Sequence, residues 1–208
     1  MLSVTLSTRW PLALRRQRGF TLIELMVTIS LLAILLGLAA PAFSVWSRNA
    51  QVRTVSDALQ SGARLAQTEA VRRNRQVVFF LSNDAACTAP AAAPAANGAF
   101  WVIRTVPLTA GDPAVTVQCG NLSDQAAGVT ITGPTAVCFN SMGRQTANAS
   151  PGAGTATCTL AANGVSTYDL AASGGDRPLR VLVALGGQVR QCDPARVLSA
   201  TAPDGCPT

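Results

Sequence analysis

The chain has 208 residues, no lysine and no histidine, and its 16 arginines against 10 acidic residues give a formal net charge of +6. The absence of histidine excludes imidazole metal sites and the commonest general base, and the absence of lysine excludes a Walker-type phosphate loop. Four arginines precede residue 20, which leaves 12 against 10 acidic residues in the remainder, so the high pI is poor evidence for binding nucleic acid.

An uncharged segment follows the basic N-terminus. Between Glu24 and Arg48 lie 23 residues without a charge. As a helix with a rise of about 1.5 Å per residue they span roughly 34 Å, which is enough to cross a bilayer. The arginines that precede this segment are Arg9, Arg15, Arg16 and Arg18. By the positive-inside rule we expect this leader to stay in the cytoplasm and the rest of the chain to be exported.

Two common export signals compete to explain this N-terminus. A cleaved secretory signal peptide would use Ala40-Pro41-Ala42 as its small-residue cleavage site. A twin-arginine signal would use Arg15-Arg16. Neither signal explains Glu24, because an acidic residue at the head of an apolar segment only adds to the cost of insertion.

A third interpretation explains the acidic residue. Residues 18–25, RGFTLIEL, resemble the processing site of type IV prepilins and pseudopilins. The resemblance implies that a membrane prepilin peptidase cleaves after Gly19 and that the new N-terminal Phe20 is N-methylated. It implies that Glu24 is an assembly contact, which pairs with the N-terminal ammonium of a neighbouring subunit, as a carboxylate buried among helices requires. Pro41 matches a helix-kinking proline of the family, whereas the leader of 19 residues is long for it.

Apolar residues recur every three or four positions after Arg48, which predicts an amphipathic helix. They are Val52, Val55, Leu59, Ala63, Ala66 and Ala70. Joined to the uncharged segment, they predict one helix from about Thr21 to about Asn74. We expect its first half to lie in the membrane or the filament core and its second half to pack on a globular head. A membrane anchor followed by an unrelated domain is the alternative.

Residues 58–77, ALQSGARLAQTEAVRRNRQV, resemble the helix end of the GspH/FimT family of minor pilins and pseudopilins, in which E-A-x-x-R-N precedes the first strand. The resemblance implies an α+β, pilin-like fold, in which the long N-terminal helix packs on an antiparallel β-sheet head. The implied segments are a prepilin leader (1–19), a transmembrane or filament-core helix (20–47), its amphipathic continuation (48–75) and a periplasmic, β-rich head with disulfides (76–208).

Short stretches of strand-forming residues, separated by turn residues, follow the helix. The predicted strands are 77–81, 100–106, 114–118, 128–132, 137–140, 155–160, 166–170, 179–185 and 188–192. Two low-complexity segments, 85–98 and 146–154, are expected to be surface loops.

The last two predicted strands form a hairpin around Gly186-Gly187, which we interpret as a two-residue turn. The strand register that follows from a two-residue turn places Val183 opposite Arg190. It also places Arg180 opposite Asp193, so Arg180 is expected to be half of a cross-strand ion pair with a structural role.

Residues 187–193, GQVRQCD, resemble the C-terminal signature of the GspH/FimT family, G-R-x-R followed by a short tail. In members that take up DNA, arginines of this motif and the tail bind DNA. Gly187 and Arg190 match the motif, whereas Gln188 replaces its first arginine. Arg196 adds a cation in the tail. Because glutamine releases no counterion, the replacement is expected to weaken salt-dependent affinity, and solvated surface arginines without a role are the alternative.

Six cysteines lie beyond the uncharged segment without a C-x-x-C pair, a pattern that favours disulfides in an oxidising compartment over a metal site. Spacing alone leaves 15 pairings open. We expect Cys192 and Cys206 to close the tail into a loop. The further pairs that we predict are Cys138 with Cys158 and Cys87 with Cys119.

The sequence predicts a minor pilin or pseudopilin at or near the tip of a type IV pilus or of a type II secretion pseudopilus. DNA capture during natural transformation is the alternative function. The expected partners are other major and minor (pseudo)pilins, the prepilin peptidase and methylase, the bacterial inner membrane and, in the alternative, double-stranded DNA. We expect no cofactor and no metal site, and a chain without histidine or a G-x-S-x-G motif is expected to be no enzyme.

Overall fold

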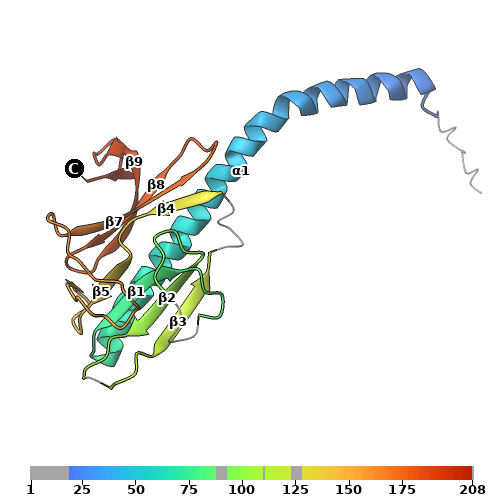
Figure 1. Ribbon diagram of the computed structural model, residues 1–208. Helices are drawn as coiled ribbons and strands as arrows, with labels where there is room; N and C mark the ends of the chain where they lie inside the picture. The colour runs from blue at the N-terminus through green and yellow to red at the C-terminus, as the bar shows by residue number, and fades with distance from the viewer. Residues whose placement is uncertain (1–18, 88–92, 110, 123–127, 208) are drawn as a thin grey trace, which may run out of the picture. The chain divides into compact units, whose positions relative to one another are not determined.

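A computed structural model describes residues 19–87, 93–109, 111–122 and 128–207 (Figure 1). The predicted leader therefore lies outside the described residues, apart from Gly19. The chain divides into two compact units, Met1–Pro41 and Ala42–Thr208, each of which we describe by itself.

The single long helix, α1, extends over Leu22–Arg73, which confirms the predicted helix to within one residue at each end. It begins where the backbone N–H of Glu24 donates to Oγ1 of Thr21 at 3.3 Å, so Thr21 is the N-cap. It ends where Asn74 adopts a positive φ of 48° and the following amide donates to the carbonyl of Ala70 at 3.2 Å. Both ends are thus closed by capping contacts.

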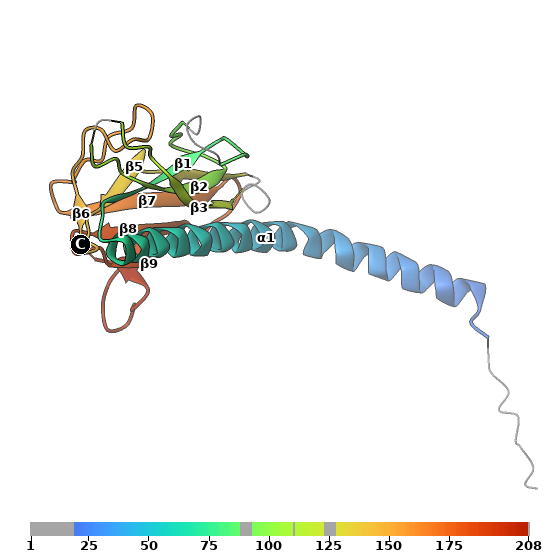
Figure 2. The same ribbon diagram turned by 90° about the horizontal axis from the view of Figure 1, so that it is seen from below.

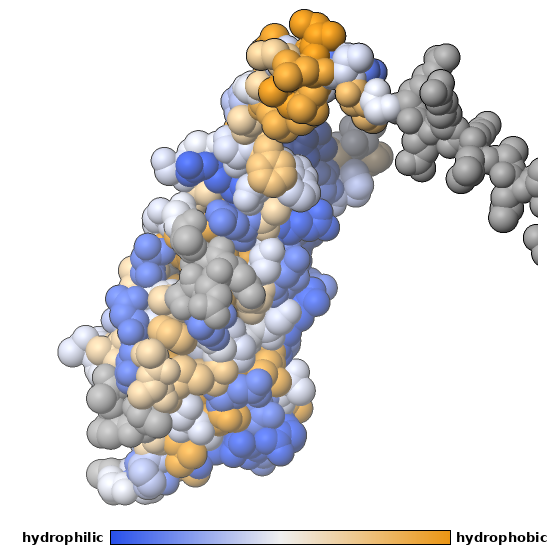
Figure 3. Space-filling model, turned by 90° about the vertical axis from the view of Figure 1, so that its right-hand side faces the viewer, coloured by the Kyte–Doolittle hydropathy of each residue, from blue (hydrophilic) through white to orange (hydrophobic). Residues whose placement is uncertain are grey.

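The first unit consists of the apolar, N-terminal part of α1. Its side chains are exposed within the chain itself, and the apolar surface that they form is visible in Figure 3. Among the described residues, α1 is the helix that is long and apolar enough to cross a membrane. Pro41 lies inside α1, and the kink expected at this proline stays a prediction.

The second unit joins the C-terminal part of α1 to two five-stranded sheets, which lie alongside it (Figures 1 and 2). The first sheet contains, in spatial order, β3 (Thr116–Asn121), β2 (Phe100–Thr105), β1 (Val77–Ser82), β5 (Ala136–Phe139) and β6 (Gln145–Thr146). The second contains β10 (Gly205–Cys206), β9 (Val189–Val197), β8 (Leu179–Ala184), β7 (Val165–Ala172) and β4 (Val129–Thr132). In the described strands all pairings are antiparallel except that of β9 with β10. The α+β fold is confirmed.

The main core lies between α1 and both sheets. The stripe of apolar residues predicted on the helix is buried here and packs against side chains of β1, β5, β7 and β8. β1 is buried along its whole length, because Phe79 faces this core while Phe80 enters a second cluster on the other face of the sheet. A central strand covered on both faces is apolar throughout, which is why this strand was easily predicted.

Three disulfides join Cys87 to Cys119, Cys138 to Cys158 and Cys192 to Cys206, which are the three predicted pairs. The predicted strand 155–160 is wrong, since Cys158 forms only an isolated bridge with Asn148. The segment is held to the sheet by its disulfide and by buried Ala156 rather than by a strand ladder. Two short strands, β6 and β10, were not predicted, and β3 begins two residues later than expected.

The predicted register of the last hairpin is also wrong, by one residue. The amide of Ala184 donates to the carbonyl of Gln188 at 2.9 Å, which leaves a three-residue turn, Leu185 to Gly187. Gly187 has a φ of +87°, as the last residue of such a turn commonly does. Arg190 therefore faces Leu182 instead of Val183.

The same shift changes the partner of Arg180. Arg180 faces Cys192 on β9, so the expected contact with Asp193 does not form. Its Nε atom instead donates to Oδ1 of Asp169, on the other neighbouring strand β7, at 2.6 Å. The expected cross-strand ion pair exists, but it joins β8 to β7.

Candidate functional site: the N-terminal segment and a groove on the head

The predicted cleavage site lies just before the first turn of α1. Gly19 and Phe20 are exposed, and a Cβ atom built on Gly19 has no heavy atom within 4 Å. In the described part of the chain the carboxylate of Glu24 forms no ion pair. Glu24 lies in the first turn of α1, where the helix dipole favours a negative charge. Cleavage, methylation and pairing at these residues stay predictions.

The acidic residue of the E-A-x-x-R-N motif lies near the C-terminal end of α1. Glu69 is almost fully buried and accepts hydrogen bonds from Nε and Nη2 of Arg72 at 2.9 and 2.7 Å. Nε of Arg73 donates to the same carboxylate at 2.8 Å. These bonds lower the pKa of Glu69 below its usual value, although burial opposes the shift. The spacing of three and four residues between Glu69 and the two arginines is the sequence signal for this cluster, which the sequence analysis did not predict.

Gly187, the glycine of the C-terminal motif, lies in a tight contact between two turns. A Cβ atom on it would stand 1.8 Å from the carbonyl oxygen of Gly143 and 2.5 Å from Nε2 of Gln67. That amide of Gln67 donates to the same carbonyl at 3.1 Å. The β8–β9 turn, the β5–β6 turn and α1 therefore meet at one point that only glycine can occupy.

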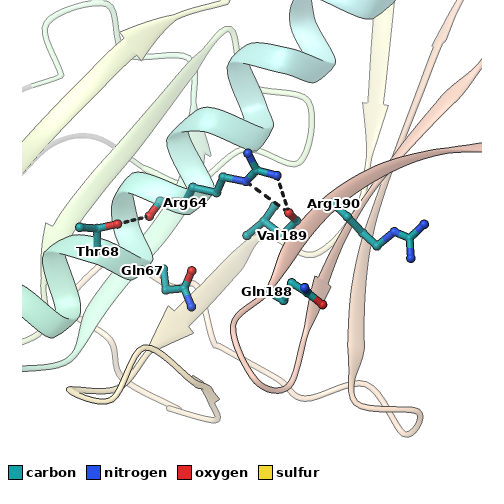
Figure 4. Close-up of a pocket in the computed structure, with 6 residues that line it drawn as sticks. All are labelled: Arg64, Gln67, Thr68, Gln188, Val189 and Arg190. Atoms are coloured by element: carbon teal, nitrogen blue, oxygen red, sulfur yellow. Dashed lines mark hydrogen bonds between the residues drawn. The ribbon is translucent and has the colours of Figure 1, made fainter. Parts of the chain in front are cut away.

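This contact places the start of β9 beside α1. A groove of about 520 Å³ between them is lined by Arg64, Gln67, Thr68, Gln188, Val189 and Arg190 (Figure 4). Nε and Nη2 of Arg64 donate to the carbonyl oxygen of Val189 at 3.3 and 2.9 Å, and Figure 4 shows the guanidinium of Arg190 pointing away from Arg64. No acidic group among the described residues pairs with Arg190. The groove is thus polar and positively charged.

The third candidate for DNA binding, Arg196, lies outside this groove. Its Nη1 atom is 3.2 Å from Oδ2 of Asp204 and its Nε atom is 3.9 Å from Oδ2 of Asp193. β10 and the Cys192–Cys206 disulfide hold this part of the tail against β9. The structure therefore brings Gln188 and Arg190 together but places Arg196 among acidic residues.

A second polar contact ties the β7–β8 loop to α1. The side-chain amide of Asn49 donates to Oδ1 of Asp176 at 2.6 Å, and its oxygen accepts from the backbone amides of Asp176 and Arg177 at 3.1 and 3.2 Å. Arg48 adds a hydrogen bond to the carbonyl of Ser173. Within the described ranges no group of three potential metal ligands occurs.

Comparison with known families identifies the class of protein. Residues 14–40 match the prokaryotic N-terminal methylation motif, and residues 55–187 match the family of the type II transport protein GspH. Because the second match covers more than half of the chain, the chain belongs to the GspH family. The match ends at Gly187, so it includes the helix end and most of the head.

Among solved structures, two crystal forms of the minor pilin FimU of Pseudomonas aeruginosa are similar at 14% identity. They cover 68% and 72% of this chain and 96% of the FimU chain, with TM-scores of 0.45 and 0.47. The minor pseudopilin EpsH of the Vibrio cholerae type 2 secretion system is similar at 14% identity, over 70% of this chain and 99% of EpsH, with a TM-score of 0.44. A search of curated proteins finds no match.

Proposed function

We propose that this chain is a minor pilin or pseudopilin, which is processed at its N-terminus and assembles at or near the tip of a type IV pilus or type II secretion pseudopilus. One observation carries the proposal: the methylation motif and the GspH region occur on one chain and share the helix α1. An export signal alone would account for neither the position of Glu24 nor the GspH region.

In this proposal the leader, residues 1–19, stays in the cytoplasm and is removed by the prepilin peptidase, which also methylates Phe20. Residues 20–47 span the inner membrane before assembly and lie in the filament core after it. Residues 48–75 continue the helix, and residues 76–208 form the head in the periplasm. Three disulfides in the head agree with an oxidising compartment.

Glu24 gives the assembly step its physical basis. Its carboxylate stands among apolar side chains, and a charge in a bilayer costs several kcal/mol unless it is paired. A free N-terminal ammonium at Phe20 of a neighbouring subunit would supply the missing partner. The pair forms only when subunits lie side by side, so it favours the filament over the isolated chain.

Mass spectrometry of the mature protein tests the proposal. We expect a methylated Phe20 at the N-terminus and recovery of the processed chain in filaments sheared from cells. An N-terminus at Phe43 would show cleavage after Ala42 by an ordinary signal peptidase and would contradict the proposal. Deleting the gene separates the two systems, because loss of surface pili indicates a type IV pilus and loss of protein export indicates type II secretion.

DNA capture is the second candidate. It is supported by the groove in which Arg64 and Arg190 stand without an acidic partner among the described residues. The pairing of Arg196 with Asp204 weakens it, because a paired cation releases fewer counterions. DNA retention across a salt series tests this candidate. Equal retention by the wild type and the Arg190→Ala, Arg196→Ala double variant would exclude these residues as the site.

A further inference from the structure

An exposed apolar cluster borders the groove at the end of α1. It consists of Val71 of α1, Met142 of the β5–β6 turn and Leu185 of the β8–β9 turn, which are 52%, 71% and 39% exposed. We call these three residues the helix-end platform. These three exposed apolar residues lie on elements that contact one another although they are far apart in the sequence, so they offer a surface for a partner to cover.

Short contacts hold the three elements together. A Cβ atom on Gly143, the residue after Met142, would stand 3.0 Å from Cγ2 of Val71. The backbone amide of Gln145 donates to the carbonyl of Leu185 at 2.9 Å. Gln145 is itself buried, and its side chain bonds to the carbonyl of Val183 and accepts from Oγ of Ser166 at 2.9 Å. The platform is therefore fixed before any partner arrives, which lowers the entropic cost of binding.

Three arginines without an acidic partner among the described residues lie on α1, on the β5–β6 turn and at the start of β9. Arg64 and Arg190 line the neighbouring groove, and Arg144 is exposed in the β5–β6 turn. Where the chain is described, no acidic group lies within 4.0 Å of any of the three. The nearby carboxylate of Glu69 is already shared between two other arginines. This end of the head thus carries a positive charge that the described residues do not neutralise.

The opposite end of β8 differs in this respect. There Arg53 and Arg177 line a second hollow of about 780 Å³ together with Asp176, Asp193 and Asp204. Cations and acidic groups are mixed in that hollow, so no single sign of charge dominates. A partner selected by charge would therefore distinguish the two ends of the head.

We propose that the helix-end platform docks a second filament subunit through an acidic protein surface that carries at least one exposed apolar side chain. This inference rests on the proposed function, and it adds the surface and the chemistry of the partner. A protein surface satisfies both features, because it covers the apolar residues and supplies carboxylates to the arginines. DNA phosphates would satisfy the arginines but would leave Met142, Val71 and Leu185 in water. Arginine and methionine are both enriched in protein interfaces.

Site-specific cross-linking in cells that make the filament tests the proposal. The full-length chain carries the photoreactive residue p-benzoylphenylalanine in place of Met142, and adducts are identified by mass spectrometry. We expect an adduct with a chain that itself has a prepilin motif. The matched control places the same residue at Val197, which is 61% exposed and lies seven residues beyond Arg190, roughly 23 Å along β9. That position should give no such adduct.

Charge reversal makes the test sharper. Combining Arg144→Glu with Arg190→Glu should lower the yield of the adduct at position 142 by about tenfold or more, because both changes place like charges against the acidic partner. Arg177→Glu, at the other end of β8, should change the yield by less than about twofold. Unchanged melting temperatures of the double variant and of the Arg177→Glu control exclude unfolding as the cause.

Three results would overturn the inference: an adduct only with DNA or lipid, an adduct insensitive to charge reversal, or no adduct from a chain that is processed and recovered in sheared filaments. In the third case the proposed function survives and only the docking surface fails. If the wild-type chain is neither processed nor found in filaments, the proposed function fails, and the docking surface fails with it.

Discussion

Replacing Gly187 by alanine tests how firmly the β8–β9 turn is fixed against the rest of the head. The new Cβ atom would stand 1.8 Å from the carbonyl oxygen of Gly143, whereas real Cβ contacts are essentially never shorter than 3.0 Å. The two turns must therefore move apart by about 1 Å. That movement would also stretch the hydrogen bond from Gln67 to Gly143.

Two costs add at this position. A φ of +87° costs alanine roughly 1–2 kcal/mol relative to glycine. Forcing an atom into a packed contact costs typically about 1–3 kcal/mol. We therefore expect Gly187→Ala to lower the free energy of unfolding by about 2–5 kcal/mol. For a domain of this size that loss lowers the melting temperature by roughly 5–15 °C.

Circular dichroism of the full-length protein in detergent, with its disulfides intact, measures the effect during thermal unfolding. Gly186→Ala is the matched control, because a Cβ atom on Gly186 meets nothing within 4 Å and its φ is outside the left-handed range. The control should change stability by less than about 0.5 kcal/mol. Equal melting temperatures for the two variants would refute the packing argument.

Three further predictions concern other contacts. Glu24→Ala should still be inserted and cleaved but be absent from sheared filaments, and normal incorporation would rule out the pairing role. Because hydrogen bonds lower the pKa of Glu69, its stabilising effect is present above the carboxylate's ordinary pKa of 4.5 and is lost as the pH falls through the lowered value. Glu69→Gln should thus flatten the fall in melting temperature on acidification from pH 5 to about pH 3, and an unchanged slope would contradict this. Asn49→Ala should speed amide hydrogen exchange of residues 173–177 while costing only about 1 kcal/mol globally, and unchanged exchange there would show that Asn49 does not hold the loop.

Elements whose burial is continuous were predictable from the sequence. α1 combines an uncharged segment with an amphipathic stripe, and both ends have capping residues, so its bounds were correct to one residue. β1 and β8 are apolar and central in their sheets. Residues 155–160 were misread because three threonines that alternate with Ala156, Cys158 and Leu160 give the period of a strand, whereas the segment is held by its disulfide and by buried Ala156. β6 and β10 have two residues each, too few for any pattern.

Turn geometry limited what could be inferred about the hairpin. Two consecutive glycines favour a two-residue turn, yet only Gly187 adopts a positive φ, and the turn includes Leu185. The shift of one residue changed the partner of Arg180 from Asp193 to Asp169. A strand register is sensitive to such a shift because it depends on the turn, and short-range sequence does not specify which turn forms.

The groove was only half predictable, since its two sides lie more than a hundred residues apart. The motif identified Gln188 and Arg190, but nothing in the sequence indicated that Gln67 and Arg64 would face them. What joins the two sides is the packing at Gly187, where the glycine of the motif contacts Gly143. The glycine was recognised by resemblance, and its physical role became visible only in the tertiary contact.

The distribution of arginines bears on the choice between a protein partner and DNA. Several arginines of the second unit already pair with acidic groups of the same chain: Arg72, Arg73, Arg75, Arg180 and Arg196. A protein that binds DNA through counterion release needs several unpaired cations on one surface, and its affinity falls with salt in proportion to their number. Near the end of α1 the second unit has three arginines, Arg64, Arg144 and Arg190, and three exposed apolar residues. With so few cations, the affinity for DNA should depend only weakly on the salt concentration. A surface that combines positive charge with apolar side chains matches the requirements of a subunit interface.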